Sequence, residues 1–170
     1  MAMLTKWVNR ILSIFSVFLY IVLVCCVIWQ VLSRYVLGTP SIVTDELSRF
    51  LFMWVGLIGA AYVTGLKRHL AIDLLLIKTT GQKKKILEIV ILVIMLFFAS
   101  FILVYGGANL AWDTHISGQI SPSIGLDMGL VYLCIPISGL IMMFYILVDL
   151  IEKITNKPSS LPTNTATITE

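Results

Sequence analysis

Four long apolar stretches constrain the fold of this 170-residue chain more than any other feature of its sequence. The stretches are Ile11–Ser33, Phe50–Leu66, Ile89–Trp112 and Met128–Val148. A helix needs about 17–25 apolar residues to cross a hydrocarbon core of about 30 Å. The second stretch is the shortest, at about 25 Å of helix, and it can span if Arg49 and Lys67 reach outward to the headgroups. We therefore predict an all-α integral membrane protein with four transmembrane helices.

The expected spans cover residues 11–33, 46–66, 88–112 and 128–149. Only 12 % of the residues are charged, about half the share in a soluble domain, so no separate soluble domain is expected. One membrane domain should cover residues 1–155, with short amphipathic segments at the membrane surface over residues 1–10 and 66–78. The tail, residues 156–170, has too few apolar residues to fold. An alternative with three spans leaves the second stretch partly in the interface.

Lys and Arg side chains decide how such a chain lies in the membrane. The N-terminal segment holds two of them, the segment between the second and third stretches six, and the tail two. The first loop holds two, and the segment from Asp113 to Asp127 holds none. Both termini are therefore predicted in the cytoplasm, with ten basic residues inside and two outside. The basic run at Lys83–Lys85 should face anionic lipid, and we expect no binding of nucleic acid.

Charged residues gather at the start of the second stretch, where they need an explanation. With two residues that end the first helix, they form a candidate cluster at the outer membrane edge: Gln30, Arg34, Asp45, Glu46 and Arg49. In one interpretation Thr44 caps the helix, and the acids face the positive end of its dipole. In the other, Arg49 pairs with Asp45 or Glu46. Arg34 either joins the acids across the short loop or reaches lipid phosphates.

Two pairs of small residues lie four apart on the second helix: Gly56 with Ala60, and Ala61 with Gly65. Small residues at this spacing let another helix approach closely, which matters in lipid because packing drives helix association there. The approaching helix could belong to this chain or to another subunit, and the sequence leaves both possibilities open.

No set of residues points to catalysis or to a bound metal or cofactor. Trp54, His69 and Asp73 are expected at the membrane interface. His69 and Asp73 are placed one turn apart at its inner side, where a hydrogen bond is expected because a closed metal site needs more ligands. Cys25, Cys26 and Cys134 fall inside the stretches and are expected to be small buried apolar groups. No carboxylate lies at the centre of a stretch, although ion and proton pathways depend on such groups. Glu88 comes nearest, at the start of the third stretch.

These absences favour a subunit over a protein that acts alone. A small proton-coupled carrier of four helices is one alternative, but such carriers rely on an embedded carboxylate in the first helix, which is missing here. A membrane enzyme is the other alternative, and it would need a nucleophile beside the charged cluster.

Three segments, read in order, carry a resemblance to a known family: WQVLSRYVLGTP, TDELSRFLFMWVGLIGAAY and KRHLAIDLL. From Gln30 through Trp54 to Asp73 they resemble the small membrane subunit of tripartite ATP-independent periplasmic (TRAP) transporters, the DctQ-like family. The resemblance implies a large membrane subunit that carries the substrate and sodium sites, and a periplasmic protein that delivers the substrate. It implies sodium-driven import of an organic acid across the bacterial inner membrane. Sialic acid is the expected substrate and a C4-dicarboxylate the alternative, and this chain would brace the scaffold without a cofactor of its own.

Overall fold

The computed structural model describes residues 2–66 and 82–155. These residues are helical apart from short connections and one isolated β-bridge between Ile120 and Asp127. The elements are α1 (Ala2–Tyr35), α2 (Ile42–Gly65), α4 (Gln82–Phe97), the π-helix η1 (Phe98–Gly106), α5 (Gly107–Ile116), α6 (Met128–Tyr132) and α7 (Cys134–Ile154). Because α4, η1 and α5 follow one another directly, they form a single long helix.

Four of the helical segments are long and apolar enough to cross a membrane: Thr5–Tyr35, Ile42–Gly65, Ile86–Ile116 and Met128–Glu152. They correspond to the four predicted spans and extend beyond most of the predicted ends. The second span was expected to be the shortest. It has 24 residues, because the helix begins before Asp45 and includes the charged residues that precede the apolar stretch. The predicted amphipathic N-terminal segment continues into α1 from Ala2 without a break. The segment predicted over residues 66–78 lies outside the described residues beyond Leu66, as does the tail.

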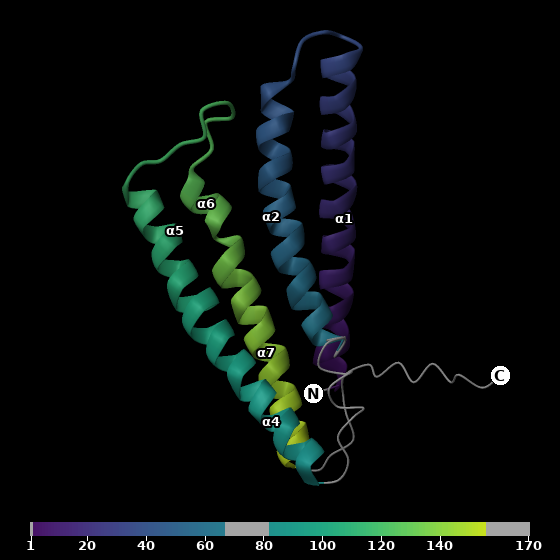
Figure 1. The fold of residues 1–170 in the computed structure, drawn as a ribbon, viewed down its shortest axis with the longest axis vertical. Coiled ribbons are helices and arrows are strands. Elements are labelled where there is room, and N and C mark those ends of the chain that lie inside the picture. Colours follow the sequence, from purple (N-terminus) through teal and green to yellow (C-terminus); the bar gives the residue numbers. More distant parts are fainter. Residues whose placement is uncertain (1, 67–81, 156–170) are drawn as a thin grey trace, which may run out of the picture.

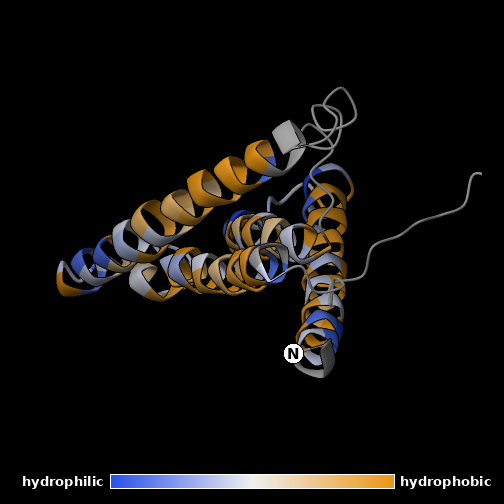
Figure 2. Ribbon diagram, turned by 90° about the horizontal axis from the view of Figure 1, so that it is seen from below, coloured by the Kyte–Doolittle hydropathy of each residue, from blue (hydrophilic) through white to orange (hydrophobic). Residues whose placement is uncertain are grey.

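The helices lie side by side in the order α1, α2, α7 and the long helix formed by α4, η1 and α5 (Figure 1). Seen from below, hydrophobic colour follows the helices along most of their length, and hydrophilic colour collects near their ends (Figure 2). We call the end that carries the connections 36–41 and 117–127 the loop end. α1 begins and α7 ends at the opposite end (Figure 1).

α7 is the central helix of the bundle. In the most apolar part of the span Met128–Glu152, which contains most of α7, 44 % of the residues are buried. The corresponding share in the α1 span, Thr5–Tyr35, is 11 %. One core cluster joins Leu12 of α1, Ile58 of α2 and Tyr145 of α7. A second joins Leu92 and Ala99 of the long helix to Ile146 of α7. α7 therefore connects an N-terminal hairpin, α1 with α2, to the long third span.

Close approach between the third span and α7 depends on glycine. A Cβ added to Gly139 of α7 would lie 2.7 Å from Cβ of Leu103 in η1, and one added to Gly107 would lie 2.6 Å from the side chain of Ile135. The π-helical segment therefore lies at a close contact between these two helices. π-Helices are rare and are often found at functional sites.

Candidate functional site

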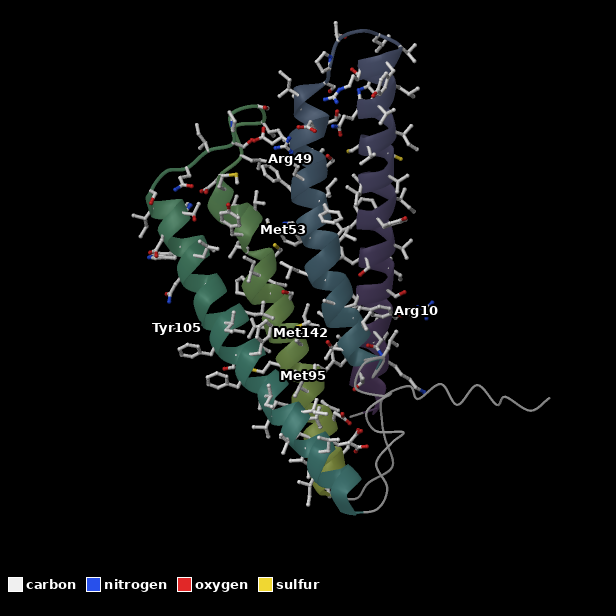
Figure 3. All side chains as sticks on the ribbon, in the orientation of Figure 1. Arg10, Arg49, Met53, Met95, Tyr105 and Met142 are labelled. Atoms are coloured by element: carbon white, nitrogen blue, oxygen red, sulfur yellow. The ribbon has the colours of Figure 1, made fainter. Side chains whose placement is uncertain are left out.

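The charged cluster at the loop end is centred on the carboxylate of Asp45. The side-chain amide of Gln30, on α1, donates a hydrogen bond to one oxygen of Asp45 at 2.5 Å. The guanidinium of Arg49 donates to the other oxygen at 2.7 Å. Arg49 lies near the loop end of α2, and Arg10 lies toward the opposite end of α1 (Figure 3). Asp45 thus joins α1 to α2, and the hydroxyl of Ser48 adds a long contact of 3.5 Å to Gln30.

Arg34 does not belong to this cluster, contrary to one of the two roles considered for it. Among the described residues, no ion pair joins Arg34 to Asp45 or Glu46, and the acids are reached from α1 by Gln30 instead. Arg34 is exposed. The connection is closed instead by the residue before it, Ser33, which is buried and donates its hydroxyl to the carbonyl of Thr39.

The predicted cap at Thr44 is wrong, because α2 begins two residues earlier, at Ile42. Ser41 occupies the N-cap position without a side-chain hydrogen bond. Thr44 lies inside the first turn and donates its hydroxyl to the carbonyl of Ser41 at 3.1 Å. Asp45 still falls in the first turn, so the favourable interaction with the helix dipole remains available to it.

Glu46 has a different partner from its neighbour Asp45. Its carboxylate accepts the backbone N–H of Ser123 at 3.0 Å, a contact between residues 77 positions apart. Ser123 belongs to the connection between α5 and α6, which the sequence analysis did not relate to the acids. Glu46 therefore links the N-terminal hairpin to the second loop, while Asp45 holds the two helices of the hairpin together.

Trp54, two turns further along α2, makes a second contact of the same kind. Its indole N–H donates to the backbone carbonyl of Val131 at 3.1 Å, again 77 positions away. The helical hydrogen bonds are interrupted there, because α6 ends at Tyr132 and α7 begins at Cys134. Pro136 has no N–H with which to continue them. Backbone groups inside a membrane must find partners within the protein, and Trp54 supplies one at this break.

The two pairs of small residues on α2 face in different directions. Ala61 is fully buried, and a Cβ added to Gly65 would lie 2.6 Å from the ring of Tyr145 on α7. Gly56 and Ala60 are exposed, and a Cβ added to Gly56 would meet no atom within 4 Å. One pair therefore packs within this chain, and the other is open to a partner.

A further polar contact closes the connection between α5 and α6. Asp127 caps α6 by accepting the N–H of Gly129 at 2.8 Å, and its other oxygen contacts Nδ1 of His115. The N–H of Gly129, and after it the His115 side chain, hold the pKa of Asp127 below its ordinary value. No pattern in the sequence predicted a role for His115. An aspartate directly before a helix is the one signal that could have indicated the cap.

The remaining predicted residues are the His69–Asp73 pair and the three cysteines. His69 and Asp73 lie outside the described residues. Of the cysteines, which are all free, Cys134 is buried as expected, but Cys26 is half-buried and Cys25 is exposed on the outer face of α1. Within the described part of the chain, no group of three metal-binding side chains is found.

Most of this chain matches one known protein family. Residues 23–156 match the family model described as the DctQ component of tripartite ATP-independent periplasmic transporters. The chain belongs to the DctQ family. This confirms the resemblance carried by the segments between Gln30 and Asp73. A DctQ-family protein is a multi-pass permease component of the bacterial inner membrane and not an enzyme.

Three relatives show how far the DctQ-family similarity extends. A putative TRAP transporter small permease protein of Haemophilus influenzae is 25 % identical over 154 residues, which is 91 % of this chain and 94 % of the relative. The sialic acid TRAP transporter small permease protein SiaQ of Vibrio cholerae is 27 % identical over 142 residues, 84 % of this chain and 80 % of the relative. The C4-dicarboxylate small permease protein DctQ of Rhodobacter capsulatus is 31 % identical over 107 residues, 63 % of this chain and 47 % of the relative. This chain is thus similar to small permeases of complete TRAP systems, which also contain a large permease and a periplasmic binding protein.

Proposed function

We propose that this small permease transports nothing alone and serves as the scaffold subunit of a sodium-coupled importer of an organic acid. The large permease would carry the substrate and sodium sites, and the periplasmic protein would deliver the substrate. The observation that supports this division is the position of charge. In the described spans, acidic and basic side chains lie near the ends, as Glu46, Arg49 and Glu88 do, and none lies at the middle. Coupled movement of ions usually needs ionisable groups at membrane depth.

The substrate proposed is sialic acid, with a C4-dicarboxylate as the alternative. SiaQ of Vibrio cholerae covers more of this chain, and DctQ of Rhodobacter capsulatus is more nearly identical over a shorter part of it. Because the substrate would be bound by the other two components, the choice does not depend on the residues of this chain.

The open face of α2 is our candidate contact for the large permease. Gly56 and Ala60 are exposed in the middle of this face, with Phe52, 70 % exposed, toward the loop end, and with Val63 toward the other end. A helix of the large permease could approach the backbone closely at the two small residues. The charged cluster would support this contact indirectly, because Asp45 fixes α1 against α2 and Glu46 fixes the second loop.

The proposed orientation places both termini in the cytoplasm, so that the loop end faces the periplasm. The distribution of Lys and Arg, ten against two, supports it. In a variant without native cysteines, a cysteine placed at Ser117 should react with an impermeant reagent in intact cells, and one placed at Gln82 should not. Labelling at position 82 together with protection at position 117 would reverse the orientation.

Reconstitution into liposomes tests the scaffold function. With an imposed sodium gradient, the purified chain alone should take up neither sialic acid nor a C4-dicarboxylate. Uptake should begin when the large permease and the binding protein are added. Uptake by the chain alone that is lost in a Glu88→Gln variant would establish the alternative, an autonomous small carrier.

A further inference from the structure

The connection between α5 and α6 is closed at its base by one pair of side chains. His115 lies in the last turn of α5 and contacts Asp127, which caps α6 through Gly129. Gly129 lies directly beneath the histidine, since a Cβ added to it would be 2.7 Å from Cβ of His115. The pair therefore bridges the two helices at a point where their backbones approach closely.

The connection above this pair is ordered and reaches across to α2. The N–H of Ser121 donates to the carbonyl of Leu126 at 2.8 Å, and the N–H of Met128 donates to the carbonyl of Gln119 at 2.9 Å. At its tip, the N–H of Ser123 is bound by Glu46 of α2. A change at the base of the connection can therefore reach the N-terminal hairpin through a short series of hydrogen bonds.

Few ionisable groups surround His115. Its side chain is 60 % exposed. Residues 116–126 contain no ionisable side chain. The ionisable groups on the neighbouring elements are Asp113 on α5, Asp127 and Tyr132 on the α6 side, and Glu46 and Arg49 on α2. Of these, the one base, Arg49, is paired with Asp45. Histidine is the side chain that changes charge between about pH 5 and 8.

We propose that His115 and Asp127 form a pH-sensitive clasp that holds the 117–127 connection more firmly in acid than in alkali. A neutral imidazole can give Asp127 an ordinary hydrogen bond, whereas an imidazolium gives it a charge-assisted one, which is stronger. Protonation of His115 therefore tightens the base of the connection and, through Ser123, its attachment to Glu46.

The carboxylate partner does not change charge in the same range. The pKa of Asp127 lies below its ordinary value of 3.8, because the N–H of Gly129 and His115 favour the ionised form. The stabilisation that ionised Asp127 contributes is therefore present above the ordinary pKa. It is lost only as the pH falls through the lowered pKa.

Hydrogen exchange of the full chain in lipid nanodiscs tests the clasp. After correction for intrinsic exchange rates, the amides of Ser121 and Met128 should be about two- to fivefold more protected at about pH 5.5 than at about pH 8, as an exposed ion pair allows. A His115→Gln variant should keep a hydrogen-bonding side chain but lose this dependence on pH. The amide of Val36, bonded to Leu32 in the other connection, should not change.

Two outcomes for the unmodified chain and the His115→Gln variant would overturn the proposal. One is protection that is independent of pH in the unmodified chain. The other is the same dependence on pH in the His115→Gln variant, which would assign the effect to a different group. An Asp127→Asn variant keeps an acceptor for Gly129 and should also lose the dependence, so that a loss confined to His115→Gln would likewise contradict the clasp.

Discussion

Both faces of α2 carry a pair of small residues four positions apart, but the surroundings of the two pairs differ. On the inward face, Ala61 and Gly65 let Tyr145 of α7 lie against the helix backbone. On the outward face, Gly56 and Ala60 have the same spacing and are exposed, and a Cβ added to Gly56 meets none of the described residues within 4 Å. The pattern of small residues therefore indicates that another helix can approach closely. The helix that faces each pair of small residues decides which contact forms.

The inward face also carries the contact that holds a broken helix. Trp54 lies on this face with Ile58, which is almost completely buried, and its indole binds the carbonyl of Val131. The outward face carries Arg49, whose side chain is 74 % exposed, and Phe52. Substitutions on the inward face should therefore change the stability of the chain itself, and those on the outward face should change its assembly.

Gly65→Val should produce the largest loss of stability. The added side chain would overlap the ring of Tyr145, which would have to move and give up its hydrogen bond to Asn9. We expect a loss of about 1–3 kcal/mol in the free energy of unfolding, measured by titration with SDS in mixed micelles. Gly59→Val is the matched control, because a Cβ there meets nothing within 4 Å. Equal losses in both variants would contradict the distinction between the faces.

Trp54→Phe should have a smaller effect on the same face. The ring remains, but the carbonyl of Val131 loses its donor at the break between α6 and α7. The expected loss is about 0.5–1.5 kcal/mol, with faster hydrogen exchange of the amides around Leu133. A Phe52→Leu change on the outward face serves as the control and should leave the exchange around Leu133 unaltered.

Substitutions of the charged residues should change stability still less, and they should distinguish the role of Asp45 from that of Glu46. In double-mutant cycles, Asp45→Asn and Arg49→Gln should be coupled by about 0.3–0.5 kcal/mol, as expected for an exposed pair one turn apart. Glu46→Gln and Arg49→Gln should be coupled more weakly, because Glu46 is bound to Ser123 and its Coulombic interaction with Arg49 is minor. Coupling between Glu46 and Arg49 that exceeds the coupling between Asp45 and Arg49 would reverse this assignment.

Gly56→Leu should change the stability of the isolated chain least, by no more than about 0.5 kcal/mol. If the outward face contacts the large permease, the same variant should fail to co-purify with it, because the added side chain keeps the two backbones apart. Ile21→Leu, on the exposed side of α1, is a control that should assemble normally. Undiminished co-purification of Gly56→Leu would place the contact elsewhere.

The spans could be predicted because they depend on local composition. Long runs without charge identify all four, and the cluster of Gln30, Asp45 and Arg49 follows from helical spacing and a short connection. The direction of each small-residue pair could not be predicted, because Gly56 and Gly65 differ only in what stands opposite them. The partners of Glu46 and Trp54 lie 77 residues away, and no periodicity within α2 contains that information.

The two interruptions within helices differ in how far the sequence indicates them. Pro136 has no N–H for the carbonyl of Tyr132, four residues earlier, and the break lies in that turn, at Leu133, where α6 and α7 separate. Phe98–Gly106 reads as an ordinary apolar helix in the sequence, and nothing in its composition indicates wider turns.

The π-helix η1 has a consequence for insertions and deletions in this chain. A segment with i→i+5 hydrogen bonds accommodates residues that an α-helix of the same length would not. Deleting one residue from Phe98–Gly106 can be absorbed there, because turns that revert to α-helix need fewer residues. The same deletion in the α-helical part of the third span would rotate everything beyond it by about 100°. Ala111 and Thr114, now buried, would then swing away from α6, and His115 would leave Asp127. Two deletions that look alike in a hydropathy profile would therefore differ in whether they put the loop end out of register.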